Sequence, residues 1–172
     1  ASEIVNSLLN FSRTGPRQFE DVDLARVIRE TLTLVEHQMA KAGIQVQAEL
    51  AGALPPIRGN ANQLQQVFLN LFLNARDAME QGGTLRVRAW EGDSGVQVEV
   101  ADTGLGIPAE HVPRIYDPFF TTKASRKGTG LGLSITYGIV RDHGGVIEVE
   151  SRPPEGARFR LEFPVLRKAV NA

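Results

Sequence analysis

The order of helix-like and strand-like segments narrows the fold of this chain more than any other feature. Apolar residues recur with helical spacing in the ranges 24–43, 60–81 and 131–145. Apolar and polar residues alternate, as in half-buried strands, in the ranges 44–50, 84–90, 96–102, 146–151 and 157–164. This order predicts an α+β fold in which helices cover one face of a mixed, mostly antiparallel sheet.

The segments around these elements suggest the domain limits. Residues 1–15 have helical apolar spacing and run into the breaker cluster "TGP", so we interpret them as the end of a longer helix. Residues 16–166 are predicted to form one domain, with a short tail at 167–172. Residues 103–130 form a loop that is too long for a simple connector, which favours a functional lid.

Composition argues against several function classes. A formal net charge of -1 gives no reason to expect nucleic acid binding. The chain has no cysteine, which excludes disulfides and thiolate metal sites, and its three histidines lack a metal-ligand spacing. No apolar run is long enough to span a bilayer. We therefore expect a cytoplasmic chain without direct membrane contact, whatever anchor the parent protein has elsewhere.

The helix predicted at 60–81 has two polar faces. One is charged and carries Gln65, Arg76 and Glu80, and we interpret it as the solvent side. The other is a narrow, amide-rich stripe formed by Gln63, Gln66, Asn70, Asn74, Asp77 and Gln81. This amide stripe is either surface that hydrogen-bonds water or neighbouring backbone, or the wall of a polar cleft. Amide oxygens are hard ligands that suit Mg²⁺, which often bridges nucleotide phosphates.

Two glycine-containing loops favour the cleft. "DTGLGIP" (102–108) directly follows a predicted strand, whose end can hold the Asp102 carboxylate rigidly. Gly104 and Gly106 allow the main chain of this loop to approach a flat ring. "KGTGLGLSI" (127–135) precedes a helix, whose N-terminal amides form a ready anion site. Either loop alone is consistent with a tight turn, but both together with the amide stripe predict a nucleotide site.

Other phosphate-binding loops do not fit the sequence. A Walker A loop requires GxxxxGK[ST], and no such string is present. The glycines of "GTGLGL" stand at positions 128, 130 and 132, which is not the Rossmann spacing, and a predicted lid rather than a strand precedes them.

Four motifs, in this order, resemble those of the catalytic, ATP-binding domain of two-component sensor histidine kinases, within the wider group of gyrase-, Hsp90-, histidine kinase- and MutL-like ATPases. "NQLQQVFLNLFLNARDAM" (62–79) resembles the N box and "DTGLGIP" the G1 box. "DPFFTTK" (117–123) resembles the F box and "GTGLGLS" (128–134) the G2 box. The resemblance implies a two-layer α/β sandwich of the Bergerat type, with ATP and Mg²⁺ held between the N-box helix and a long lid.

The resemblance also implies roles for individual residues. Asn74 would bind Mg²⁺, Asn70 would lie beside the phosphates, and Asp102 would accept a hydrogen bond from the adenine amino group. Lys123 would meet the γ-phosphate, which makes Asn70, Asn74 and Lys123 the implied catalytic residues. The two loops would flank the base and wrap the phosphates, so the implied nucleotide-binding set also includes Asp77, Gly104, Gly106, Ile107, Arg126, Gly128, Thr129, Gly130, Leu131, Gly132 and Leu133.

One departure from the wider group bears on the reaction. The ATP-hydrolysing relatives carry a glutamate general base one turn before the Mg²⁺-binding asparagine, and this sequence has Asn70 there. An amide cannot take a proton, so transfer to a protein side chain fits better than hydrolysis. A nucleotide-driven ATPase switch and a partner-binding module with degenerate catalysis stay open as alternatives.

The expected phosphoacceptor is not in this sequence. Sensor kinases resemble one another in following the acceptor histidine with an acidic residue, and none of His37, His111 and His143 is followed by one. We therefore expect the acceptor on a helical dimerisation hairpin of the parent protein, and a response regulator receiver domain as the next partner. The parent is expected to be a homodimer, and the isolated chain a monomer that does not phosphorylate itself.

Overall fold

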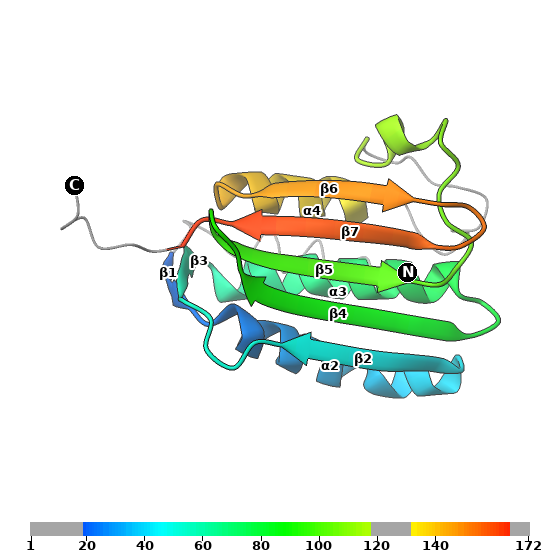
Figure 1. Cartoon of the computed structure of the whole chain (residues 1–172), viewed down its shortest axis with the longest axis horizontal. Coiled ribbons are helices and arrows are strands. Elements are labelled where there is room, and N and C mark those ends of the chain that lie inside the picture. Colours follow the sequence, from blue (N-terminus) through cyan, green and yellow to red (C-terminus); the bar gives the residue numbers. More distant parts are fainter. Residues whose placement is uncertain (1–18, 118–131, 166–172) are drawn as a thin grey trace.

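The structure is a computed structural model that describes residues 19–117 and 132–165. In this part of the chain, strands β1 (Glu20–Val22) and β3 (Ile57–Gly59) form a small antiparallel pair. The main sheet has the strand order β2-β4-β5-β7-β6, with bounds β2 (Ile44–Leu50), β4 (Gly83–Glu91), β5 (Val96–Asp102), β6 (Val146–Ser151) and β7 (Ala157–Phe163). Strands β2 and β4 are parallel and the other neighbours are antiparallel, which confirms the predicted mixed sheet (Figure 1).

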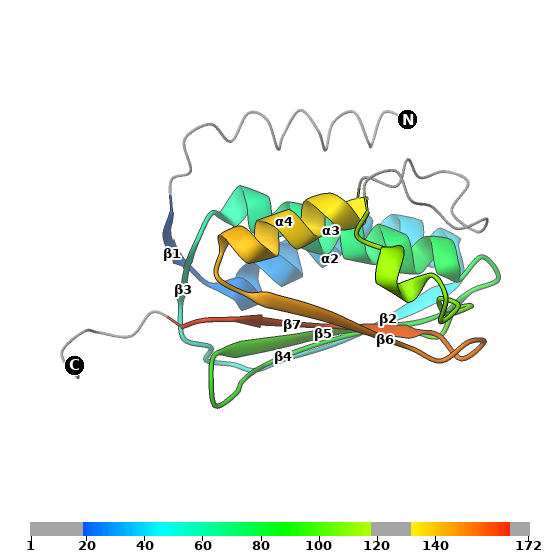
Figure 2. The same cartoon turned by 90° about the horizontal axis from the view of Figure 1, so that it is seen from above.

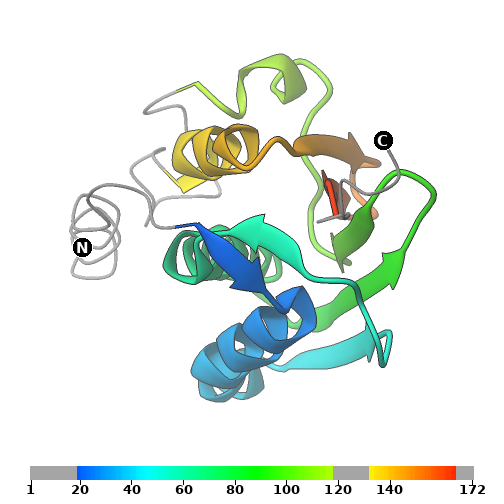
Figure 3. The same ribbon diagram turned by 90° about the vertical axis from the view of Figure 1, so that its left-hand side faces the viewer.

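The helices α2 (Leu24–Lys41), α3 (Ala61–Ala78) and α4 (Gly132–Asp142) all lie on one face of the main sheet, as Figure 2 and Figure 3 show. Helix α3 packs against α2 on one side and α4 on the other. A 3-10 turn, η1 (Val112–Arg114), lies close to the end of the first described range. Within the described ranges, no helix combines the length and apolarity needed to cross a bilayer. The predicted two-layer arrangement is confirmed.

The hydrophobic core fills the space between the helices and the sheet. In β5, Val96, Val98 and Val100 alternate with polar residues and are at most 2% exposed, because side chains two apart in a strand share a face. From the helical layer, Phe68 and Phe72 of α3 are fully buried. The apolar flank of α3 therefore faces the core and leaves its amide stripe at the edge.

The opposite face of the sheet carries rows of charged side chains. Registered positions on neighbouring strands place Glu49, Arg88, Glu99 and Arg160 in one row of alternating sign. Glu99 is only 5% exposed, and its carboxylate lies 3.3 Å from Arg88 Nη1, 3.2 Å from Arg158 Nη1 and 3.7 Å from Arg160 Nε. A buried carboxylate is tolerable when cations surround it, so this cluster binds three strands together.

Helix α3 ends at Ala78, three residues before the predicted end at residue 81. The chain leaves the helix in a turn in which the Gly82 amide donates to Met79 O at 2.9 Å, and Gly82 has a φ of +90°. Gln81, which the pattern placed on the amide stripe, therefore lies outside the helix.

Helix α4 likewise ends before its predicted limit of 145, at Asp142. Gly144 has a φ of +71°, and the Gly145 amide donates to Val140 O at 2.9 Å, a bond that closes helices ending in glycine. The predicted strands at 44–50, 96–102 and 146–151 coincide with β2, β5 and β6. The segment between β2 and α3 contains the short strand β3, which pairs with β1.

Candidate functional site

Helix α3 is the element on which the candidate site is built. Its N-cap, Asn60, accepts a hydrogen bond from the Gln63 amide at 3.0 Å, as short polar caps commonly do. Within the amide stripe, Asn70 contacts α4, Gln66 is 6% exposed, and Asn70, Asn74 and Asp77 are half-buried.

Asn70 joins α3 to the first turn of α4. Its Nδ2 donates to Gly132 O at 3.1 Å and to Thr136 Oγ1 at 3.2 Å, and its Oδ1 accepts from Gln66 Nε2 at 2.8 Å. Two parts of the predicted site that are 62 residues apart in the chain, the N-box helix and the end of the G2 box, are therefore in direct contact. For Gln66 and Asn70, the first alternative given for the amide stripe therefore applies in part, since these two amides hydrogen-bond neighbouring protein groups.

Asn74 lies one turn further along the same face of α3. It is half-buried, and none of the side-chain hydrogen bonds found within residues 19–117 and 132–165 uses its amide. A half-buried amide with solvent access keeps its oxygen available as a ligand.

Asp77 has a different environment from the one that its pattern suggests. Its carboxylate accepts from Arg76 at 3.3 Å (Nε) and 3.2 Å (Nη2). Arg76 also hydrogen-bonds the Gln38 side chain of α2, and its side chain is only 22% exposed. The interpretation of Arg76 as a solvent-side residue is therefore wrong, because α2 packs beside that face of α3.

The loop 103–108 meets the C-terminal end of α3. The Leu105 amide donates to Ala78 O at 3.1 Å, which satisfies one of the carbonyls left open at the helix end. A Cβ on Gly104 would lie 2.3 Å from the same oxygen, so only glycine fits. Further along, the Ile107 amide donates to Ser151 Oγ at 2.5 Å, which ties the loop to the end of β6.

Asp102 ends β5 beside this loop. Its Oδ1 accepts from the Gly104 amide at 2.8 Å. Burial raises the pKa of the Asp102 carboxyl above its ordinary value, while backbone hydrogen bonds from Gly104 and Ala157 act in the opposite direction. A half-buried carboxylate with few donors is suited to accept a further hydrogen bond from a ligand.

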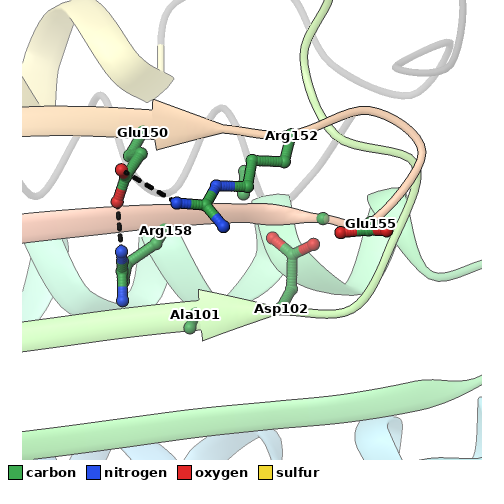
Figure 4. Close-up of a pocket in the computed structure, with 8 residues that line it drawn as sticks. Ala101, Asp102, Glu150, Arg152, Glu155 and Arg158 are labelled. Atoms are coloured by element: carbon green, nitrogen blue, oxygen red, sulfur yellow. Dashed lines mark hydrogen bonds and ion pairs between the residues drawn. The ribbon is translucent and has the colours of Figure 1, made fainter.

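A pocket of about 250 Å³ opens at the end of β5. Figure 4 shows the Asp102 carboxylate pointing toward the β6–β7 turn, near Arg152. Arg158 hydrogen-bonds Glu150 across the rim and lowers the pKa of that carboxyl. The pocket contains Asp102 but no member of the amide stripe, so it does not outline the predicted nucleotide cleft.

None of its described neighbours requires the glycine that begins α4. A Cβ on Gly132 would lie 3.8 Å from Asn70 Cγ, an ordinary contact distance. Leu133 is half-buried and packs against the core. The other predicted phosphate-loop and lid residues, Lys123, Arg126, Gly128, Thr129, Gly130 and Leu131, lie outside the described residues.

Sequence reasoning missed Thr136 as a member of this site. It is fully buried, and its hydroxyl lies 3.2 Å from Asn70 Nδ2. Its position one helical turn after Gly132 is the signal that could have identified it, since residues four apart share a helix face.

A family profile described as histidine kinase-, DNA gyrase B-, and HSP90-like ATPase matches residues 59–167. The sensor histidine kinase ZraS of Escherichia coli O157:H7 is 40% identical over 164 residues, which make up 95% of this chain and 35% of that protein. The chain thus spans about a third of the length of this curated relative.

Solved structures show the same fold. The nucleotide-free catalytic domain of histidine kinase ThkA is 35% identical, with a TM-score of 0.77 over 86% of this chain and 98% of that one. ThkA in complex with the response regulator protein TrrA is similar with a TM-score of 0.77 at 29% identity, over 96% of this chain and 48% of that one. Full-length ShkA in complex with AMPPNP gives 0.80 at 30% identity, over 97% of this chain and 36% of that one.

These matches confirm the family that the four motifs predicted: the chain belongs to the histidine kinase-, DNA gyrase B- and HSP90-like ATPases, and among them to the catalytic domains of sensor histidine kinases.

Proposed function

We propose that this chain binds Mg²⁺–ATP beside α3 and transfers the γ-phosphoryl group to a histidine on a helical hairpin, as the first step of a two-component phosphorelay. The observation that carries the proposal is that α3 contacts two separate segments, the start of α4 and the loop after β5. Its middle is hydrogen-bonded to the start of α4 through Asn70, and its C-terminal end is hydrogen-bonded to the loop after β5 through Ala78. One helix therefore aligns both glycine loops along a single polar edge.

The proposed residue roles are those that the four motifs imply. Asp102 accepts a hydrogen bond from the adenine amino group, and Gly104 lets the loop main chain lie close beside the base. Gly132, with the glycines at 128 and 130, surrounds the phosphates near the N-terminus of α4, where helical amides favour anions. Lys123, with Arg126 as a second candidate, meets the γ-phosphate from the lid.

The donor set fits a nucleotide-bound Mg²⁺ rather than a metal cage made by the protein. In the described part of the chain, no group of three or more His, Asp or Glu side chains is placed to hold a metal ion. Mg²⁺ commonly takes one or two protein ligands, with phosphate and water oxygens as the others, so the Asn74 amide oxygen suffices on the protein side. When bound, the ion neutralises charge on the transferring phosphoryl group.

The environment of Asn70 supports transfer over hydrolysis. Its Nδ2 donates to α4 and its Oδ1 accepts from Gln66, so both ends of the amide are used in holding the site together. Neither end can accept a proton from an attacking water. The chain positions ATP and neutralises its charge, and the incoming imidazole supplies the nucleophile.

The partners follow from the proposed reaction. The acceptor is the hairpin histidine of the parent protein, for which residues 1–15 would form the end of the second hairpin helix, ahead of a catalytic domain at 16–166 and a tail at 167–172. ThkA was crystallised with a response regulator, which supports a receiver domain as the next partner here. The isolated chain would be a monomer and the parent a homodimer.

Mixing the chain with a separately made acceptor hairpin and γ-labelled ATP tests the proposal. We expect acid-labile phosphohistidine on the hairpin, dependence on Mg²⁺, and little phosphate release without the acceptor. Robust steady-state phosphate release in the absence of acceptor would instead support an ATPase switch. A folded chain that gives no saturable nucleotide binding would support a partner-binding module.

A further inference from the structure

His143 lies at the end of α4 that is opposite to Gly132, and it is 5% exposed. Its Nδ1 is 2.8 Å from Ile139 O, and its Nε2 accepts a hydrogen bond from the Asn60 amide at 3.0 Å. Both contacts are satisfied together by the neutral imidazole with its proton on Nδ1. The ring thus bridges the last turn of α4 and the residue that caps α3.

The surroundings of the His143 ring are closely packed. A Cβ on Gly59 would lie 2.7 Å from His143 Cδ2, so glycine lets β3 pass directly against the ring. Phe19, just before β1, stacks on the same ring with ring centroids 4.6 Å apart. Phe163, at the end of β7, meets the ring edge-on at 6.5 Å. The segment that enters the domain, the main sheet and two helices therefore converge on one imidazole.

Helices α3 and α4 are consequently hydrogen-bonded at two separate points. One is Asn70 with Gly132 and Thr136, within the candidate site, and the other is Asn60 with His143. Along α3 the two points are ten residues apart, or about 15 Å at 1.5 Å per residue. Core packing already restricts the movement of the two helices, and two widely spaced hydrogen-bonded points restrict their sliding and rotation further.

We propose that His143 is a positioning residue, which sets the alignment of α3 with α4 and thereby holds Asn70 and Asn74 in place relative to Gly132 for nucleotide binding. The proposal rests on the function proposed above and adds a residue outside the four motifs. Because Phe19 stacks on the same ring, the segment that enters the domain at β1 also contacts this residue.

The test compares His143→Phe with His143→Gln in the full 172-residue chain. Phenylalanine keeps the ring and its stacking but removes the acceptor for the Asn60 amide, while glutamine restores an acceptor without the ring. We expect His143→Phe to bind Mg²⁺–ATP about tenfold more weakly in calorimetric titration, and His143→Gln to recover part of the loss. Val35→Ala, in the buried face of α2, is the control for general destabilisation.

The proposal is overturned if folded His143→Phe binds Mg²⁺–ATP like the wild type, or if Val35→Ala with the same loss of Tm weakens binding equally. If His143→Phe does not fold, His143→Gln is compared with His143→Asn, whose shorter amide does not reach Asn60. Equal binding by these two would overturn the proposal.

Amide hydrogen exchange separates this inference from the proposed function, because it needs no nucleotide. We expect His143→Phe to accelerate exchange both at 60–64 and at 132–136. Acceleration confined to 60–64 would contradict a role in alignment. A wild-type chain that binds no nucleotide would count against the proposed function alone.

Discussion

At the scale of single residues, the site combines side chains whose polar groups find only some of their hydrogen-bond partners within the protein. Asn70 has partners at both ends of its amide, whereas burial raises the pKa of Asp102 despite two backbone hydrogen bonds. Asn74 enters no side-chain hydrogen bond within the described ranges. Groups of this kind favour ligand binding at a cost to the stability of the unliganded chain.

Replacing Asp102 with asparagine should weaken ATP binding while leaving the fold intact. The charge-assisted hydrogen bond to the adenine amino group would be lost, which typically costs roughly 1–3 kcal/mol. Titration calorimetry with ATP and with GTP measures the effect and its dependence on the base. Unchanged ATP affinity would remove Asp102 from the site.

The same variant should change the pH dependence of stability. The pKa of Asp102 is raised in the folded protein, so its contribution to stability is fully present below the ordinary value of 3.8 and is lost as the pH rises through the folded pKa. Asparagine does not titrate, so Asp102→Asn does not lose this stability as the pH rises. The stability of Asp102→Asn relative to the wild type should therefore increase from acid to neutral pH. Denaturant titrations of both chains at several pH values measure this difference, and an opposite slope would contradict the burial argument.

Replacing Asn74 with alanine should abolish the Mg²⁺-dependent part of ATP binding. The half-buried amide makes no hydrogen bond to the described residues, so the fold should lose little stability. Binding of ATP with Mg²⁺ and with EDTA, measured for both chains, gives the difference. If the Mg²⁺ dependence survives in Asn74→Ala, the metal-ligand assignment is wrong.

At the scale of elements, the two glycine loops meet α3 in different ways. Gly104 is required by the protein itself, since a Cβ there would lie 2.3 Å from Ala78 O. Among the described residues, the nearest atom to a Cβ on Gly132 would be Asn70 Cγ at 3.8 Å, an ordinary contact, and Gly132 begins α4 without a positive φ. The glycine at 104 is therefore explained by the fold, while no described neighbour requires the one at 132, which is consistent with its proposed role in the phosphate loop.

Gly132→Ala and Gly138→Ala form a matched pair that tests this difference. Gly138 lies inside α4 and has room for a Cβ among the described residues, so Gly138→Ala should stabilise the fold by about 0.5–1 kcal/mol. Gly132 is the first residue of the helix, so the gain from Gly132→Ala should be smaller. Gly132→Ala should also weaken ATP binding, whereas Gly138→Ala should not. Thermal unfolding measures the stability of the two variants, and titration with ATP measures their affinities. Equal affinities would exclude Gly132 from the phosphate site.

At the scale of the whole molecule, the sheet separates two kinds of polar surface. The helical side carries the candidate site, and the opposite side carries the cluster around Glu99. That cluster joins β4, β5 and β7, so it contributes to the rigidity of the layer on which the helices pack.

Glu99→Gln should destabilise the chain without changing its affinity for ATP. Three guanidinium groups would lose a buried carboxylate, but they are 35–55% exposed, so water compensates in part and a loss of about 1–3 kcal/mol is expected. Urea unfolding at low and high salt measures the loss. No change in stability would show that the arginines are fully satisfied by solvent.

Much of the fold and part of the candidate site could be predicted from local pattern. The limits of β2, β5 and β6 follow from alternation that is bounded by glycines or polar turns. The ends of α3 and α4 could not, because the first residue to leave a helix is decided by which turn the flanking glycines adopt. Arg76 was misplaced for a related reason: periodicity separates apolar from polar faces but does not reveal which polar face a neighbouring helix will cover.

The sequence by itself determined the family, the order of the motifs and the side of α3 that carries amides, since these depend on residue type and spacing. Only the tertiary structure decided that Asn70 donates to Gly132, that Gly104 lies against the end of α3, and that His143 accepts from Asn60 across 83 residues. Such contacts depend on how two helices pack on the same sheet, and no local pattern specifies that geometry.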